Sequence, residues 1–328
     1  MAKKEILKKR AQIISDIRSF FIDHGYLEVE TPKLVKYSGQ DFNIESFKTR
    51  VFNERDEEYT GYLITSPEFS CKKLLSEGHD KIFELGKCFR NNEPFGKFHN
   101  PEFTMLEWYS AGSNYFDLMD ETESLVKLLG KETLNYQGEI FDLTSPWKRM
   151  TMADAFKEYA DIDLADSLER DKLYKEAKRI RLNISSEDDF EEIFNNIVVS
   201  KIEPNLPKDP VFIYDFPVEL GSLARAKKED PRFAERAELY IAGLEISNGF
   251  SELNDSHEQE ARFLEEQKKR ERLGKEVHAI DPDFIKALAS MPPSAGNALG
   301  IDRLVMLLTD SADISDVISF SAKDIFSK

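Results

Sequence analysis

The sequence predicts an α+β protein, with strands and helices in one large domain that carries a helical insertion. Segments with strand-like alternation of apolar and polar side chains occur before and after a strongly charged, mostly helical region at about 151–205. A chain of 328 residues can bury a large core. Neither an internal repeat nor a low-complexity linker divides it. We therefore expect a single domain over residues 1–328.

Composition restricts the class of protein. Hydrophobic residues make up 41% and charged residues 33% of the chain, and no run of about 18 apolar residues occurs, so no membrane association is expected. The two cysteines, Cys71 and Cys88, lack the spacing of a metal site or a disulfide framework, which indicates the cytoplasm. The net charge of −17 argues against a broad nucleic-acid-binding surface.

The first half of the chain should alternate helices with short strands. Apolar side chains recur at helical spacing in residues 11–24, and Gly25 ends this helix. An extended segment at 26–35 follows, and Pro32 removes a ladder donor from it, so this strand should lie at an edge or interface. The remaining elements expected here are strands at 62–65 and 81–89, a helix at 68–77 and an amphipathic helix at 116–129.

The second half begins with the helical insertion, in which residues 185–189 are typical of a helix N-terminus. Strands are expected at 211–216 and 236–253, and a very polar, solvated helix at 257–273. A glycine-punctuated strand at about 296–300 then leads into a helix that reaches residue 309.

One strand predicts a binding site. At period two, Phe103, Met105, Glu107 and Tyr109 share a face, and Thr104, Leu106 and Trp108 face the core. A hydrophobic core does not accept an unpaired carboxylate. The first face is therefore suited to a flat base and a cationic substrate.

A hairpin supplies a second candidate site. Ala242 and Gly243 suit a two-residue turn, in a register that sets Tyr240 opposite Glu245 and Glu238 opposite Ser247. Glu238 and Glu245 then lie diagonally on one face, where they could hold Mg²⁺ together with substrate phosphates. The alternative is a pair of solvated acids on an edge hairpin.

Three weaker patterns accompany these. Asn248, Phe250 and Glu252 repeat the combination of polar, aromatic and acidic side chains on one strand face, although an ordinary half-exposed strand would show it too. Ser66 could cap a helix with Pro67 at its first position, which leaves Glu68 near a strand end. Gly296 and Gly300 precede Arg303 at a helix start, an arrangement that favours an anion.

The order of these segments resembles motifs 1, 2 and 3 of class II aminoacyl-tRNA synthetases. The stretches at 99–107 and 248–253 resemble the lysine-type branch in particular. The resemblance implies a catalytic core with an antiparallel β-sheet flanked by helices, over which ATP lies bent. It implies that Arg90 holds the α-phosphate, Phe103 stacks on adenine, Arg303 packs on the other side of the nucleotide, and Glu238 and Glu245 bind Mg²⁺.

The same resemblance implies the substrate and nucleotide contacts. Glu68, Glu107, Tyr109 and Glu252 match residues that hold the amino groups of a lysine-like substrate. The other implied substrate contacts are Ser66, Pro67, Asn248, Phe250 and Ala298, and the other implied nucleotide contacts are Asn91, Asn92, Glu93, His99, Asn100, Glu245, Ile246 and Gly300. One residue is inserted between Arg90 and His99 relative to the family pattern, so either Asn92 or Glu93 contacts the adenine amino group.

The resemblance narrows further to the elongation factor P β-lysine ligase family. The helix of motif 1 begins near residue 6, which leaves no room for an N-terminal anticodon-binding domain on the order of 100 residues. Ala298 stands where lysyl-tRNA synthetases have glycine. The resemblance therefore implies that the chain activates (R)-β-lysine or lysine with ATP and transfers it to a lysine side chain of elongation factor P, as a homodimer and without tRNA. The alternatives are a truncated lysyl-tRNA synthetase paralogue that acylates tRNA or a small molecule, and a non-catalytic regulator.

Overall fold

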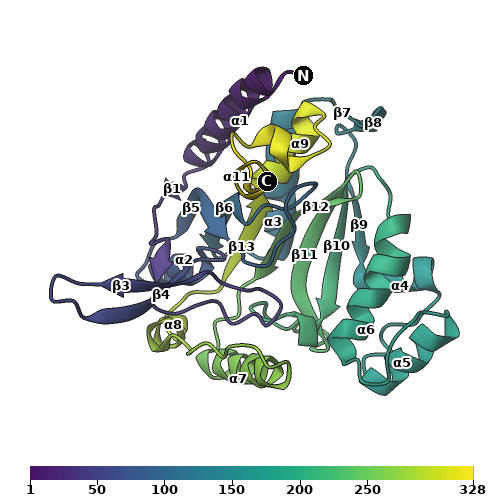
Figure 1. Cartoon of the computed structure of the whole chain (residues 1–328). Helices are drawn as coiled ribbons and strands as arrows, with labels where there is room; N and C mark the ends of the chain where they lie inside the picture. Colours follow the sequence, from purple (N-terminus) through teal and green to yellow (C-terminus); the bar gives the residue numbers. More distant parts are fainter. Residues whose placement is uncertain (328) are drawn as a thin grey trace.

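An eight-stranded sheet lies at the centre of the computed structural model, which describes residues 1–327 (Figure 1). Its strand order is β1-β5-β6-β13-β12-β11-β10-β9. In that order the strands are Leu27–Glu28, Lys81–Phe89, Glu102–Ala111, Ser294–Gly300, Leu244–Ser251, Phe233–Ile241, Val211–Pro217 and Lys148–Thr151. The six inner strands pair antiparallel, and the edge strands β1 and β9 pair parallel to their neighbours, so the sheet is mixed.

The proline-containing segment at 26–35 lies at a sheet edge, as predicted, but it is not one strand. It divides into β1 and β2 (Leu34–Val35), which belong to different sheets. The division has a local cause. The backbone N–H of Thr31 donates to the Glu84 carboxylate at 3.2 Å, and Pro32 has no N–H to donate, so the ladder cannot continue.

Three helices cover one face of the central sheet. These are α1 (Lys3–Asp23), α3 (Tyr115–Gly130) and α9 (Ile301–Thr309). Their apolar sides pack with Leu106 and Trp108 of β6 in the largest hydrophobic core, where the Phe21 ring lies 5.2 Å from that of Trp108. The predicted alternation along β6 is confirmed on this side, because Leu106 and Trp108 are fully buried. The opposite face of the sheet is not covered by these three helices, and it carries the polar side chains of the predicted site.

The insertion forms its own core against the far edge of the sheet. It consists of α4 (Met152–Ala160), α5 (Arg170–Arg179) and α6 (Phe190–Ile197), followed by short helical turns at Val198–Ile202 and Glu203–Asn205. The predicted helix start at 185–189 is confirmed, because Asp189 caps α6 in a reciprocal capping box with Glu192. Apolar side chains of the insertion pack with those of β9, β10 and β11.

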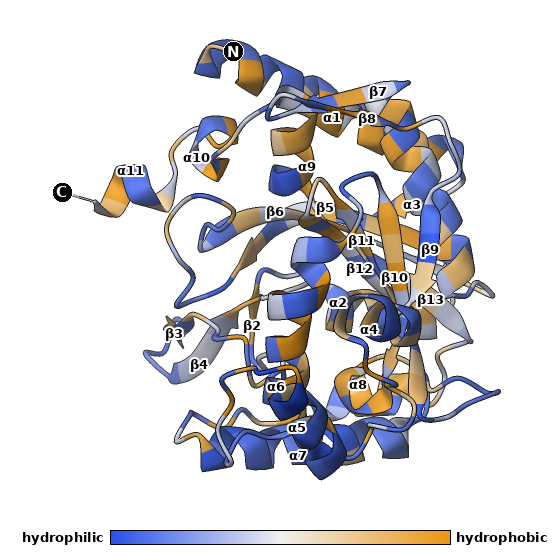
Figure 2. Cartoon of the chain, turned by 90° about the vertical axis from the view of Figure 1, so that its right-hand side faces the viewer, coloured by the Kyte–Doolittle hydropathy of each residue, from blue (hydrophilic) through white to orange (hydrophobic). Residues whose placement is uncertain are grey.

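The remaining elements complete the fold around the central sheet. A three-stranded sheet has the order β2-β4-β3, and β7 and β8 form a separate hairpin. The bounds are β3 Lys48–Phe52, β4 Glu58–Leu63, β7 Thr133–Tyr136, β8 Glu139–Asp142, α2 Glu68–Ser76, η3 Val218–Leu220, α7 Ser256–Arg272, α8 Pro282–Leu288, α10 Ile314–Val317 and α11 Ala322–Phe326. Figure 2 shows α7 mostly in hydrophilic colours, in agreement with the polar helix expected at 257–273. Among the helices of residues 1–327, none is both long and apolar enough to cross a membrane.

The β11–β12 hairpin has the predicted turn but a different register. Ala242 and Gly243 both have positive φ, at 53° and 76°, and Tyr240 lies opposite Glu245 as predicted. Glu238, however, lies opposite Asn248 and not opposite Ser247, because the register shifts by one residue. Ile246 is the extra residue of this β-bulge, and its side chain is buried in the main core.

Candidate active site

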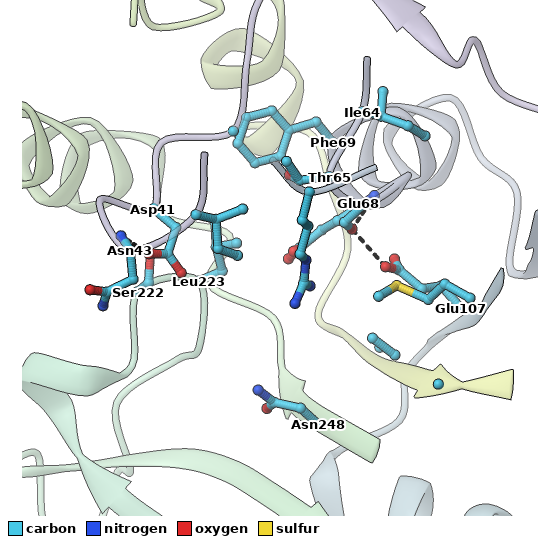
Figure 3. A pocket seen from close by; sticks show the side chains of 18 of the residues that line it. Asp41, Asn43, Ile64, Thr65, Glu68, Phe69, Glu107, Ser222, Leu223 and Asn248 are labelled. Atoms are coloured by element: carbon cyan, nitrogen blue, oxygen red, sulfur yellow. Dashed lines mark hydrogen bonds between the residues drawn. The ribbon is translucent and has the colours of Figure 1, made fainter. Parts of the chain in front are cut away.

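A cavity of about 1170 Å³ lies on the open face of the central sheet, between the sheet, α2 and the insertion (Figure 3). Strands β6, β11, β12 and β13 form its floor. The cavity brings together all the side chains predicted from the sequence except Pro67, Asn91 and Asn92, which do not line it. Side chains from segments about 200 residues apart therefore meet in one place, and their ligand roles remain predictions.

Glu107 is a buried acid on the floor of the cavity. Its two carboxylate oxygens accept hydrogen bonds from the Ser66 hydroxyl at 2.6 Å and the Tyr109 hydroxyl at 2.5 Å. Burial, followed by repulsion from Glu68, raises the pKa of Glu107 to about 7. Figure 3 shows Glu68 and Glu107 close together, with Asn248 across the cavity from them. This end of the cavity is acidic and could accept a cation.

Ser66 and Pro67 depart by one residue from the predicted helix start. The helix α2 begins at Glu68, with Pro67 as its N-cap and not as its first helical residue. The Ser66 hydroxyl still accepts from the backbone N–H of Glu68, at 3.0 Å, and donates to Glu107 at the same time. Ser66 therefore connects the start of α2 to the acidic pocket, while Pro67 is buried beside it.

A lysine that the sequence analysis did not select completes the acidic pocket. The Lys72 ammonium lies 2.6 Å from a Glu68 oxygen and 2.5 Å from a Glu252 oxygen. The side chains of Lys72 and Glu252 are both fully buried. A helical spacing of four residues from Glu68 was the available signal, but the sequence does not show that β12 brings Glu252 to the same point.

The other end of the cavity carries two arginines and an exposed aromatic face. The Arg90 guanidinium lies 5.2 Å from the centre of the Phe103 ring, and its buried Nε has no hydrogen-bond partner. Arg303 projects from the first turn of α9 and donates to the backbone carbonyl of Glu245 at 3.0 Å. A planar base and an anionic group could both be bound here.

Of the two candidates for the adenine contact, only Glu93 lines the cavity. Asn92 is exposed and has a φ of 60°, and the N–H of Asn91 donates to the carbonyl of Glu45 at 2.7 Å. The inserted residue is thereby taken up in a turn outside the cavity. Glu93 lies 2.8 Å from the His99 ring, and this contact lowers the pKa of the Glu93 carboxyl, so Glu93 is an ionised acceptor.

Glu238 and Glu245 both line the cavity near the arginines. Glu238 is buried and accepts from Arg236 at 2.7 Å and from the Tyr240 hydroxyl at 2.8 Å. Burial raises the pKa of Glu238, and the nearby Glu245 contributes to the rise. Residues 1–327 contain no group of three or more metal-ligating side chains, but two carboxylates suffice for Mg²⁺ when phosphates and water supply the other oxygens.

Gly296 has a packing role that differs from the one expected. A Cβ atom at this position would collide with the Glu252 carboxylate and the Tyr109 ring, so the glycine makes room for two pocket side chains. Gly300 is open by contrast, since its nearest neighbour would be the carbonyl of Ile246 at 3.9 Å. Only Gly300 thus leaves space for a ligand to approach the backbone.

Comparison with known proteins identifies the class to which this fold and site belong. Residues 1–324 match the family of class II tRNA synthetases (D, K and N), and the chain belongs to this family. It is 43% identical to an elongation factor P–(R)-β-lysine ligase of Photorhabdus laumondii, over 96% of this chain and 94% of the relative. It is 41% identical to a protein of the same name from Avibacterium paragallinarum, over 98% and 97%. A lysine–tRNA ligase from Thermoanaerobacter sp. is 40% identical, and the match covers 64% of that relative.

Proposed function

We propose that this chain is an ATP-dependent ligase that activates a lysine-like diamino acid and transfers it to a lysine side chain of elongation factor P. The observation that supports it most directly is the arrangement of the cavity. Three carboxylates, Glu68, Glu107 and Glu252, lie at one end, and Arg90 and Arg303 lie at the other. The names of the two ligases matched over nearly their whole length support the acceptor.

In the first step, a carboxylate oxygen of the amino acid attacks the α-phosphorus of ATP, and pyrophosphate leaves with the electrons of the broken P–O bond. Arg90 and Arg303 stabilise the negative charge on the phosphates, while Phe103 and Glu93 hold the adenine. The acidic pocket fixes the amino groups of the substrate, so that its carboxylate is held in line. The product is an aminoacyl-adenylate.

In the second step, the neutral amine of the acceptor lysine attacks the carbonyl carbon of the adenylate. An amide bond forms, AMP leaves, and the amine loses one proton to solvent.

Mg²⁺ would be held by Glu238 and Glu245, and it would neutralise phosphate charge when bound. The oxygen donors of both side chains suit this ion.

Ala298 is our candidate for the residue that distinguishes an amino group at the α-position of the substrate from one at the β-position. Ala298 lies in the floor of the cavity, paired with Glu107 of β6 and Asn248 of β12. A difference of one methyl group at such a position changes discrimination by roughly 1–3 kcal/mol. We expect Ala298→Gly to shift the ratio of pyrophosphate exchange between lysine and β-lysine, and an unchanged ratio would contradict the assignment.

The deciding experiment offers the enzyme both acceptors. Purified elongation factor P and tRNA are incubated separately with the enzyme, ATP and either lysine or (R)-β-lysine, and the products are weighed by mass spectrometry. We expect a mass gain on the protein. A gain on tRNA alone would favour the second candidate, a lysine–tRNA ligase, which the 40% identity to such enzymes also supports. Failure to exchange pyrophosphate with either amino acid would indicate a non-catalytic protein.

We further propose that the enzyme works as a cytoplasmic homodimer. Exposed apolar side chains at the end of α1 and on β1 support this arrangement, because β1 is the free edge strand of the central sheet. Class II cores pair through this region, and a two-fold interface would cover it.

A further inference from the structure

Lys72 is a buried cation inside a pocket that we assign to a cationic substrate. It lies on α2, one turn after Glu68, and its side chain is fully buried. Its ammonium contacts Glu68 of the same helix and Glu252, which follows β12, and lies 5.3 Å from the centre of the Phe250 ring. An ammonium without partners would be very costly at this depth, so its placement requires both acids.

The titratable groups around Lys72 come from five segments of the chain. They are Glu68 and Cys71 of α2, Glu84 of β5, Glu107 and Tyr109 of β6, Glu252 at the end of β12, and Lys33 of the segment between β1 and β2. Lys33 and Glu84 form an ion pair and cancel each other. The buried thiol and phenol are neutral, because their pKa values lie well above the ordinary ones.

The remaining charges match a diamino acid. Glu68, Glu107 and Glu252 contribute three negative charges when ionised, and Lys72 contributes one positive charge. The pocket thus carries two net negative charges, and both lysine and β-lysine present two ammonium groups. Without Lys72 the pocket would carry one excess negative charge after the substrate bound. One of the carboxylates would then bind a proton to compensate for the missing charge of Lys72.

We propose that Lys72 is the positioning residue of the substrate pocket: its ammonium holds Glu68 to Glu252 and keeps the net negative charge of the pocket equal to the number of substrate ammonium groups. This inference rests on the proposed function. It assigns to Lys72 a role in binding the amino acid, and none in binding ATP or in the transfer of the acyl group. A structural role alone would stabilise the fold without affecting how binding depends on pH.

The direct test replaces Lys72 by methionine, which has a similar length and no charge, and measures pyrophosphate exchange. We expect KM for the amino acid to rise about tenfold or more, with kcat and KM for ATP within about twofold of wild type. We also expect the acidic limb of kcat/KM for the amino acid to move up by about one pH unit, because Lys72 opposes the rise in the pKa of Glu252 that burial causes.

Two further variants separate charge from packing. Lys72→Arg keeps the charge, so its acidic limb should stay at the wild-type position even if its KM rises. The double variant Lys72→Met/Glu68→Gln restores the charge balance and removes the uncompensated buried charge. It should therefore fold even if the single variant does not, and its acidic limb should return to within about 0.3 pH unit of wild type.

Lys175→Met is the matched control, since this lysine is exposed on α5 in the insertion, and it should change none of these values. The proposal is overturned if Lys72→Met keeps the wild-type KM and acidic limb, or if the limb stays shifted in the double variant. It is also overturned if Lys72→Arg shifts the limb as far as Lys72→Met does. A wild-type enzyme that exchanges pyrophosphate with neither amino acid would instead refute the proposed function.

Discussion

We expect Glu107 to make substrate binding depend on pH. Its pKa of about 7 in the free protein results first from burial, which disfavours the charged form. Only the ionised carboxylate attracts a substrate ammonium, so binding is strong above this pKa and is lost as the pH falls through it. We expect kcat/KM for the amino acid to decrease about tenfold per pH unit below pH 7, whereas KM for ATP should change little.

Pyrophosphate exchange at subsaturating amino acid, measured between pH 5.5 and about 8.5, checks this prediction. Glu107→Gln is the informative variant, because glutamine cannot ionise, while its amide oxygen can still accept from one of the two hydroxyls and its amide nitrogen can donate to the other. Its kcat/KM should be low, and its acidic limb should lose the contribution of Glu107 and keep that of Glu252, whose pKa burial raises to about 8. A wild-type profile that is flat from pH 6 to about 8 would contradict the assignment of Glu107.

Gly296 allows a prediction that depends on the space around the residue and not on charge. In Gly296→Ala the new methyl group meets the Tyr109 ring and the Glu252 carboxylate, both buried and held by neighbours. We expect a decrease of about 1–3 kcal/mol in the free energy of unfolding and a large rise in KM for the amino acid. Denaturant unfolding and exchange kinetics measure the two effects.

Gly300→Ala is the comparison for stability, because its methyl group would meet no atom closer than the Ile246 carbonyl at 3.9 Å. Its free energy of unfolding should stay within about 1 kcal/mol of wild type. Equal destabilisation of both variants would mean that backbone conformation, and not the crowding around Gly296, limits these positions.

At the scale of elements, one bulge explains both the success and the failure of sequence reasoning. Periodicity and turn residues predict most strands and helices because burial on one face imposes a period of two or 3.6 residues. Strict alternation along β12, however, puts Glu245 and Asn248 on opposite faces. The bulge at Ile246 returns Asn248, Phe250 and Glu252 to the face of Glu245. Such an irregularity is a tertiary adjustment that depends on the partner strand.

The positions of Lys72 and Glu93 also depend on tertiary packing, which the sequence does not show. The helix containing Lys72 was predicted, but a lysine there is ordinarily solvated, and only the packing of α2 against the sheet buries it. The choice between Asn92 and Glu93 depended on which residue the loop would turn outward. The positive φ of Asn92 turns this residue outward in the fold. Asparagine is one of the few residue types common at positive φ, but Asn91 is of the same type, so the sequence did not locate the turn and left both candidates open.

The junction of α1, β6 and α9 supports a prediction about stability. Asp302, at the start of α9, pairs with Arg10 of α1 at 2.6 Å and accepts from the Thr104 N–H of β6 at 2.8 Å. Its side chain is almost fully buried. Asp302→Ala would leave the Thr104 N–H unpaired and the Arg10 guanidinium without its counter-charge, with the Thr104 hydroxyl as its remaining partner at 2.9 Å, and we expect a loss of about 3–5 kcal/mol in the free energy of unfolding.

Urea unfolding followed by circular dichroism measures this loss. Glu5→Ala is the matched control, because Glu5 forms an exposed ion pair with Lys8 on the same helix and its removal should have no measurable effect. If the two variants lose similar amounts of stability, the Asp302 contacts are not what joins the three elements.

At the scale of the whole molecule, the two faces of the central sheet have different roles. Its apolar face packs against α1, α3 and α9, and its polar face forms the floor of the cavity. The edge at β1 belongs to neither face. Ile22 at the end of α1 and Leu27 of β1 lie there with 57% and 53% of their surface exposed. Apolar side chains gathered at a sheet edge indicate a site of association.

This edge carries the prediction about oligomeric state. We expect the wild-type protein to sediment as a dimer of the 37.8 kDa chain, and Leu27→Glu to shift it to the monomer at micromolar concentration, because two like charges would face each other across a two-fold axis. Ile140→Glu is the control, since Ile140 is equally apolar and 73% exposed but lies on the β7–β8 hairpin. That variant should remain dimeric. A monomeric wild type, or dissociation of both variants alike, would show that β1 is not the interface. Because β1 pairs with β5, which leads directly into Arg90, the monomeric variant should also lose exchange activity, and recovery of activity with rising protein concentration would show that the active site depends on the pairing.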